Sequence, residues 1–242
     1  QFDLERNDKY LNADAVHLQG MTYRTITDPN TALELFLNGE LDSVSLSADA
    51  KEQYADDPRV WSSPSNTVSC MLINCGNTDH NKLLQNVNFR KALFHAVDRE
   101  SIAKLVKGVP ANWILGLKCL GNPETGERYR ELEGAQAYLT ENYGYDPVLA
   151  KQYYETAMSE AGLEELTLSI MYSETSNNNK ATAEYLQQSL PQVLGDTFSI
   201  ELSSASSSVV KATRKAWAKG DNPNTYELTF TGWSTSALHP GM

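Results

Sequence analysis

The order of apolar and polar positions along the chain predicts strands and helices that alternate. Runs that are continuously apolar, or that alternate apolar or β-branched with polar residues, are typical of strands. They occupy residues 16–26, 41–46, 68–74, 166–172, 197–202 and 226–231. Apolar residues three and four positions apart predict helices at residues 29–37, 50–54, 89–97, 102–106, 147–161, 178–194 and 207–218. We therefore expect an α/β fold.

Short polar side chains mark where several of these helices begin. Asp98 and Asp146 each stand before an apolar helical pattern, where a carboxylate can accept hydrogen bonds from the first free backbone amides. Either Thr27 or Asp28 can cap the first helix in the same way. Gly162 follows the pattern that starts after Asp146, and its freedom to adopt positive φ predicts a helix end there.

The strand at residues 68–74 is the most apolar one, and we place the boundary between two bodies at its start. The resulting parts are residues 1–67 and residues 68–242. Residues 112–144 have weak periodicity and many glycines, which predicts a long surface excursion. The serine-rich run at residues 203–208 is interpreted as a turn that caps the helix after it.

Composition and charge exclude some classes of protein. With 40% hydrophobic residues among 242, the chain can bury a core, so intrinsic disorder is not expected. It carries 31 acidic and 20 basic side chains, a formal charge of −11. Because nucleic-acid binding needs a basic surface, we expect no nucleic-acid partner. The start lacks the regions of a signal peptide and an initiator Met, and it begins like the middle of a strand, which predicts a piece of a longer protein.

The three cysteines, Cys70, Cys75 and Cys119, cannot all pair within one chain. With His80 they offer an alternative, a zinc-dependent module or enzyme built on these four residues. Against it, the spacing is looser than that of most zinc ligands, and a free Cys in an apolar run acts as a small hydrophobe. The chain contains no nucleophile-elbow, zinc-protease or phosphate-loop motif. We therefore expect neither catalysis nor a metal or other cofactor.

Four segments, taken in order, resemble those of one protein family. They read DPNTALELFLNGELD at residues 28–42, VNFRKALFHAVDRE at 87–100, YDP at 145–147 and YELTFTGW at 226–233. Together they are similar to segments of the oligopeptide- and dipeptide-binding proteins that feed bacterial ABC importers. The second segment is the most specific, and the resemblance runs nearly from end to end.

This resemblance implies a two-lobed fold like that of type II periplasmic binding proteins, truncated here, with mixed sheets flanked by helices. Residues 1–67 would be part of the first lobe and residues 68–242 most of the second. The implied function is extracytoplasmic capture of oligopeptides between the lobes, for delivery to the membrane subunits of an ABC importer. Related binders take metal chelates, sugars or other solutes, so a non-peptide ligand is the alternative. The family further implies a monomer in the periplasm or at the cell surface, with a lipid anchor outside these residues.

The resemblance also locates the expected ligand contacts, on the strand at residues 68–74 and on a turn at residues 232–236. These contacts are Ser69, Cys70, Met71, Trp233, Ser234 and Ser236. Backbone amides and carbonyls there could pair with an extended peptide whatever its side chains. Trp233 is either a wall of the cleft or a core residue. Peptide-binding family members carry an Asp where this chain has Ser236. The peptide's α-ammonium would then need another acid, or the ligand has no free amino terminus at that place.

Overall fold

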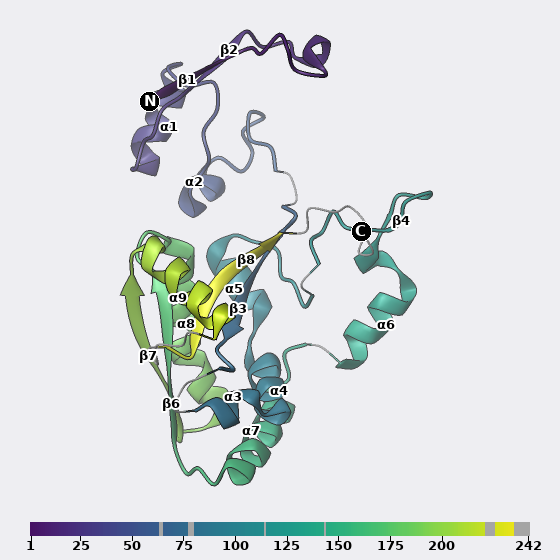
Figure 1. The fold of residues 1–242 in the computed structure, drawn as a ribbon, viewed down its shortest axis with the longest axis vertical. Coiled ribbons are helices and arrows are strands. Elements are labelled where there is room, and N and C mark those ends of the chain that lie inside the picture. Colours follow the sequence, from purple (N-terminus) through teal and green to yellow (C-terminus); the bar gives the residue numbers. More distant parts are fainter. Residues whose placement is uncertain (63–64, 77–79, 114, 143, 221–225, 235–242) are drawn as a thin grey trace. The chain divides into compact units, whose positions relative to one another are not determined.

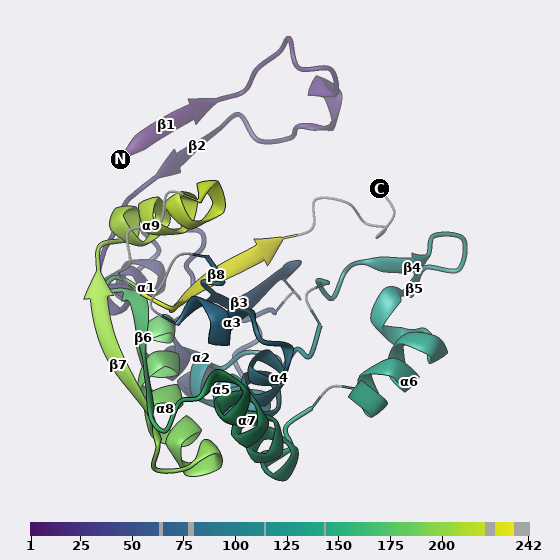
Figure 2. The same cartoon turned by 60° about the horizontal axis from the view of Figure 1, so that its bottom comes forward.

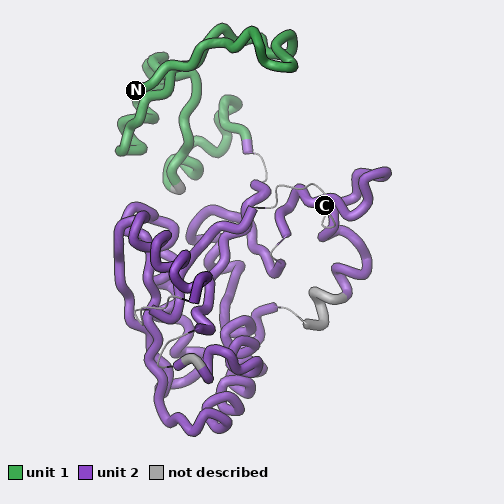
Figure 3. Tube along the Cα trace, in the orientation of Figure 1, with its two compact units in different colours: residues 1–61 green, residues 62–242 purple. Residues whose placement is uncertain are grey.

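The computed structural model describes residues 1–62, 65–76, 80–113, 115–142, 144–220 and 226–234. The chain divides into two compact units, Gln1–Trp61 and Ser62–Met242 (Figure 3). This division falls six residues before the expected boundary between residues 67 and 68. The assignment of the two parts to lobes stays a prediction.

The first unit contains a two-stranded hairpin and two α-helices (Figure 1). β1 (Phe2–Glu5) pairs antiparallel with β2 (Gly20–Tyr23), and the short 3-10 helix η1 (Ala13–Ala15) lies between them in the chain. α1 (Pro29–Leu37) begins after Asp28, whose carboxylate accepts a hydrogen bond from the Thr31 backbone N–H at 2.7 Å. α2 (Ala48–Gln53) begins after Ser47, which caps it. Asp28, and not Thr27, is therefore the first cap.

Two strands predicted for this unit differ from the structure. Of the predicted strand at residues 16–26, only the four residues of β2 form a strand, and residues 41–46 form none. Alternation of apolar and polar residues is a local signal, whereas a strand also needs a neighbour for its backbone hydrogen bonds. Residues 41–46 have no such neighbour among the described residues.

A four-stranded mixed sheet forms the centre of the second unit (Figure 1). Its strands are β3 (Thr67–Ile73), β6 (Leu166–Ser173), β7 (Phe198–Ala205) and β8 (Leu228–Ser234), in the order β3-β8-β6-β7. β6 pairs parallel with β7 and β8, and β3 pairs antiparallel with β8. Each strand overlaps one that the sequence predicts, and β7 and β8 each end three residues later than expected.

Helices pack around this sheet (Figure 2). They are α3 (Asn81–Gln85), α4 (Val87–Ala96), α5 (Arg99–Val106), α7 (Pro147–Ala161), α8 (Asn177–Leu194) and α9 (Ser207–Lys219). Asp98 caps α5 and Asp146 caps α7, and α7 ends at Gly162 with φ of 67°, as the sequence predicts. Of the helices in the described part of the chain, none combines the length and the apolar character that a membrane span requires.

The core of the second unit joins these helices to the sheet. Phe89 of α4, Tyr154 of α7 and Phe198 of β7 make successive ring contacts, with centroid distances of 6.4 and 5.8 Å. Fully buried aliphatic side chains pack around them, among them Leu93, Leu168, Ile170, Leu186, Leu190 and Leu194. This core holds the sheet in place, and with it the strands on which the expected ligand contacts lie.

Residues 112–144 contain more regular structure than their sequence predicts. They hold the hairpin of β4 (Leu120–Asn122) and β5 (Glu127–Arg128), the 3-10 helix η2 (Tyr129–Glu131) and α6 (Glu133–Asn142). Gly121 is needed there because a Cβ atom at this position would lie 2.7 Å from Leu132 Cδ1 and 2.9 Å from Tyr129 Cα. Part of the glycine content therefore serves close packing within this segment.

Candidate functional site

β8 pairs with its two neighbours over different lengths, and this leaves part of one edge open. β3 pairs with β8 from Leu228 to Ser234, whereas β6 pairs with it only at Leu228 and Thr229. Within the described residues, residues 230–234 have no paired strand residue on that other edge. Five residues of β8 therefore keep one edge available for an added strand.

The structure brings five of the six predicted contact residues together on the β3–β8 pair. Ser69, Cys70 and Met71 of β3 lie opposite Gly232, Thr231 and Phe230 of β8. Trp233 and Ser234 lie opposite Val68 and Thr67, and the hydroxyls of Ser234 and Thr67 are 2.6 Å apart. Ser236 lies outside the described residues.

The prediction of a turn at residues 232–236 is wrong for its first three residues, because Gly232, Trp233 and Ser234 continue strand β8. Pairing with β3 extends β8 to Ser234, beyond residue 231, where the sequence pattern of β8 ends. The Trp233 side chain is 53% exposed, so it does not fill the core of this unit. Its role as a wall of the ligand cleft stays a prediction.

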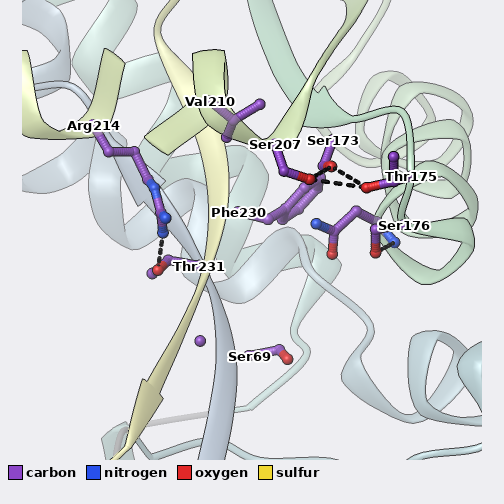
Figure 4. Close-up of a pocket in the computed structure, with 11 residues that line it drawn as sticks. Ser69, Ser173, Thr175, Ser176, Ser207, Val210, Arg214, Phe230 and Thr231 are labelled. Carbon is purple, nitrogen blue, oxygen red and sulfur yellow. Dashed lines mark hydrogen bonds between the residues drawn. The ribbon is translucent and has the colours of Figure 1, made fainter. Parts of the chain in front are cut away.

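A pocket of about 380 Å³ lies at the open edge of β8 (Figure 4). Six of its lining side chains carry hydroxyls: Ser69, Ser173, Thr175, Ser176, Ser207 and Thr231. The others are Asn179, Val210, Arg214, Phe230 and Gly232. The lining residues lie on β3, at the end of β6, on β8, in the connection before α8 and its first turn, and on α9 between Ser207 and Arg214.

Three of these hydroxyls form one hydrogen-bonded cluster. Ser173 Oγ lies 3.0 Å from Thr175 Oγ1 and 2.6 Å from Ser207 Oγ, and the latter two atoms are 2.8 Å apart. Each hydroxyl can donate one hydrogen bond and accept more, so the cluster can serve a ligand donor or a ligand acceptor. We call Ser173, Thr175 and Ser207 the hydroxyl cluster.

The serine-rich run does more than the sequence predicts. Ser206 caps α9, with its Oγ 3.4 Å from the Val209 backbone nitrogen, as expected. Ser203 and Ser204 are strand residues of β7 instead of a turn, and Ser207 joins the hydroxyl cluster. The serine content was the one sequence signal for this part of the pocket. Ser173, Thr175 and Arg214 had no such signal, because the fold assembles them from distant segments.

Arg214 is the cation of the pocket. Its Nη1 donates a hydrogen bond to Thr231 Oγ1, and its buried Nε has no hydrogen-bond partner in the described part of the chain. Burial raises the pKa of the Cys70 thiol above its usual value, and the positive charge of Arg214 acts in the opposite direction. Arg214 is therefore close enough to stabilise negative charge on the β3–β8 pair.

We expect Arg214→Gln to raise the pKa of the Cys70 thiol, because the substitution removes a charge that favours the thiolate. The rate at which iodoacetamide alkylates Cys70 can be followed by peptide mass mapping over a range of pH. The pH at which this rate rises should be higher in Arg214→Gln than in wild type. Lys215→Gln is the matched control, since Lys215 is exposed on the same helix. Identical pH profiles for wild type and Arg214→Gln would show that the charge does not reach Cys70.

The zinc alternative gains no support from the described residues. Cys70 lies on β3, the Cys75 thiol donates to Leu84 O at 3.3 Å, and Cys119 is 1% exposed. His80 Nδ1 lies 3.5 Å from Glu227 Oε1. Within the ranges that the structure describes, no three His, Cys, Asp or Glu side chains form a group that could hold a metal ion.

Comparisons with known proteins agree with this architecture. A family model described as bacterial extracellular solute-binding proteins, family 5, middle part, matches residues 1–242. The dipeptide-binding protein DppE of Bacillus subtilis is 30% identical over 196 residues, covering 79% of this chain and 34% of that protein. A dipeptide-binding protein of Lactococcus lactis is 25% identical over 247 residues, covering 99% of this chain and 42% of that protein.

A solved structure supports the same fold. Listeria monocytogenes OppA bound to peptide matches with a TM-score of 0.72 at 23% identity, covering 96% of this chain and 43% of that one. These matches cover less than half the length of either curated relative, 34% and 42%. The expected fold, a truncated mixed α/β structure of the type II periplasmic-binding-protein kind, is confirmed.

Proposed function

Because this chain belongs to the bacterial extracellular solute-binding proteins of family 5, we propose that it captures peptides outside the cytoplasm for delivery to an ABC importer. The family consists of solute binders and not of enzymes. Two curated relatives are named dipeptide-binding proteins, and one structural neighbour is described as bound to peptide. A monomeric state and a lipid anchor outside residues 1–242 are part of the proposal and rest on the family resemblance alone.

The open edge of β8 is the observation that carries this proposal. An extended peptide can add to such an edge through backbone hydrogen bonds, which ignore the identity of its side chains. Residues 230–234 offer this edge, and β3 holds them in register from the other side. The pocket beside the edge is rich in hydroxyls, which can bind ligand side chains directly or through water.

Native mass spectrometry of the full-length protein, purified without added ligand, tests the class of ligand. We expect added masses that resolve, after acid release and sequencing, into a set of short peptides. A single non-peptide solute, such as a sugar or a metal chelate, would keep the fold and overturn peptide capture.

Backbone methylation of the ligand tests the pairing with β8. In an antiparallel or parallel pair, the amides that point toward the partner strand recur at every second residue. We therefore expect N-methylation to lower affinity about tenfold at alternate positions of one bound peptide, since each lost hydrogen bond costs about 1 to 1.5 kcal/mol. Isothermal titration calorimetry measures the series, and side-chain changes to alanine at the same positions are the control. Equal losses at all positions, or none, would contradict pairing at this edge.

A further inference from the structure

The three hydroxyls of the hydroxyl cluster lie close enough to bond one another in a closed triangle. The oxygen of Ser173 lies 3.0 Å from that of Thr175 and 2.6 Å from that of Ser207, and the third side of the triangle measures 2.8 Å. A hydroxyl carries one proton, so the cluster holds three protons for its three hydrogen bonds. When all three bonds form, every proton points into the triangle, and only oxygen lone pairs remain for a ligand.

The closed triangle distinguishes ligand groups that donate hydrogen bonds from groups that only accept them. An N–H or O–H group can donate to a lone pair while the triangle stays intact. A group that only accepts, such as an ester, needs a proton from the cluster, and one internal hydrogen bond must break to supply it. Because one hydrogen bond is exchanged for another, the accepting group gains little from the contact. The cluster therefore favours donors.

The rest of the lining disfavours a donor that is positively charged. Among the described residues that line the pocket there is no Asp or Glu, and Arg214 is the single charged side chain. An ammonium group placed there would lose hydration without meeting a carboxylate, and the guanidinium would repel it. The donor that fits the pocket is therefore neutral.

Two other lining residues suit a neutral polar side chain. The backbone N–H of Asn179 donates to Ser176 Oγ, whereas its side-chain amide takes part in no hydrogen bond among the described residues. This amide can pair with a group that both donates and accepts. Figure 4 shows Phe230 on the same side of β8 as the hydroxyl cluster, where its ring can cover methylene groups of a ligand. A carboxamide on a short apolar stem matches both features.

We propose that the hydroxyl cluster selects a neutral hydrogen-bond donor at one position of the bound peptide, best supplied by the carboxamide of an Asn or Gln side chain. The carboxamide NH2 group donates to the outward lone pairs of the cluster and leaves the triangle intact. This inference rests on the proposed peptide binding at β8 and adds a side-chain preference to it.

Substitution in the ligand tests this preference in the full-length protein. Each residue of a short peptide that binds is replaced in turn by Gln or by the methyl ester of Glu, which has a similar shape but no N–H donor. We expect Gln to bind about fivefold more tightly than the ester at one position and equally well at its two neighbours, since the ester must break one hydrogen bond of the cluster. Isothermal titration calorimetry gives the affinities. Equal affinities at every position would overturn the inference and leave peptide capture intact.

Two variants assign the preference to the hydroxyl cluster. Thr175→Val and Ser207→Ala each replace an exposed residue and leave two hydroxyls, which use one proton for their mutual bond and keep the other free to donate. The ester should therefore gain affinity, and its disadvantage relative to Gln should fall from about fivefold to less than about twofold. A merely structural role would not improve binding of the ester.

Matched controls carry the same substitutions outside the pocket. Thr167→Val and Ser199→Ala each disrupt a pair of exposed hydroxyls, 2.7 Å apart, at the opposite ends of β6 and β7. Both controls should keep the preference for Gln. If Thr175→Val and Ser207→Ala keep it as well, or if the controls lose it too, the hydroxyl cluster is not its cause and the inference is wrong.

A second probe separates the inference from the proposed function. Propionamide and methyl propionate, each at high millimolar concentration, carry the same two groups without a peptide backbone. We expect propionamide to raise the melting temperature of wild type more than methyl propionate does, and this difference to disappear in Thr175→Val. Such a result in a protein that binds no peptide would keep the donor site and overturn peptide capture. Equal effects of the two probes in a protein that binds no peptide would overturn both proposals.

Discussion

Phe89→Ala is expected to lower the free energy of unfolding of the second unit by about 3 to 5 kcal/mol. Phe89 is completely buried, and its ring contacts that of Tyr154, which in turn meets Phe198. Alanine would leave a cavity between α4, α7 and the sheet, because close-packed neighbours collapse only in part. Urea denaturation followed by circular dichroism measures the loss.

Val87→Ala is the control for this prediction. Val87 opens the same helix but is 54% exposed, so its replacement should change stability by less than about 0.5 kcal/mol. A Phe89→Ala protein that unfolds within about 1 kcal/mol of wild type would show that α4 is not part of the core that holds the sheet.

Glu227→Ala is expected to destabilise the second unit by about 3 kcal/mol and to disturb the start of β8. Glu227 Oε2 accepts hydrogen bonds from the Ser169 backbone N–H at 2.8 Å and from the Ser169 hydroxyl. The carboxylate therefore serves as an acceptor for β6 just before β8 begins to pair with it. Alanine would leave a partly buried backbone donor of β6 without an acceptor, which is the costly way to lose a hydrogen bond.

Two further variants sharpen this prediction. Glu227→Gln keeps an acceptor oxygen, so its loss should be about 1 kcal/mol. Glu201→Ala removes an exposed carboxylate from β7 and should be nearly neutral. The free energies come from urea denaturation, and peptide affinity of the same variants shows whether the open edge is disturbed. Equal stability of Glu227→Ala and Glu201→Ala would contradict a structural role for the Glu227 carboxylate.

The position of Glu227 links stability to the proposed site. Residues 230–234 can receive an added strand only if β8 leaves β6 after Thr229 and continues along β3. The Glu227 side chain and the paired residues Leu228 and Thr229 hold β8 to β6 up to that point. The same short segment therefore stabilises the sheet and determines where its open edge begins.

The sequence by itself determined the four strands of the central sheet and helices α4, α5, α7, α8 and α9, but neither α3 nor the elements within residues 112–144. Apolar periodicity reports which face of a segment is buried, and Asp98, Asp146 and Gly162 act through neighbouring backbone groups. Such signals need no knowledge of the remaining chain. The motif order was also enough to indicate the family. Ser69, Cys70 and Met71 were expected on a strand, whereas Trp233 and Ser234 were expected on a turn and lie instead on its partner strand β8.

Only the tertiary structure decided what these strands do together. The sheet order β3-β8-β6-β7 and the early end of the β6–β8 pairing depend on contacts between distant segments, which no local pattern encodes. The continuation of β8 through Ser234 depends on β3 in the same way. The pocket unites Ser173, Ser207, Arg214 and Thr231 from three separate elements, β6, α9 and β8. Hydroxyls and one arginine are common on any surface, and only their convergence in space makes them a candidate site.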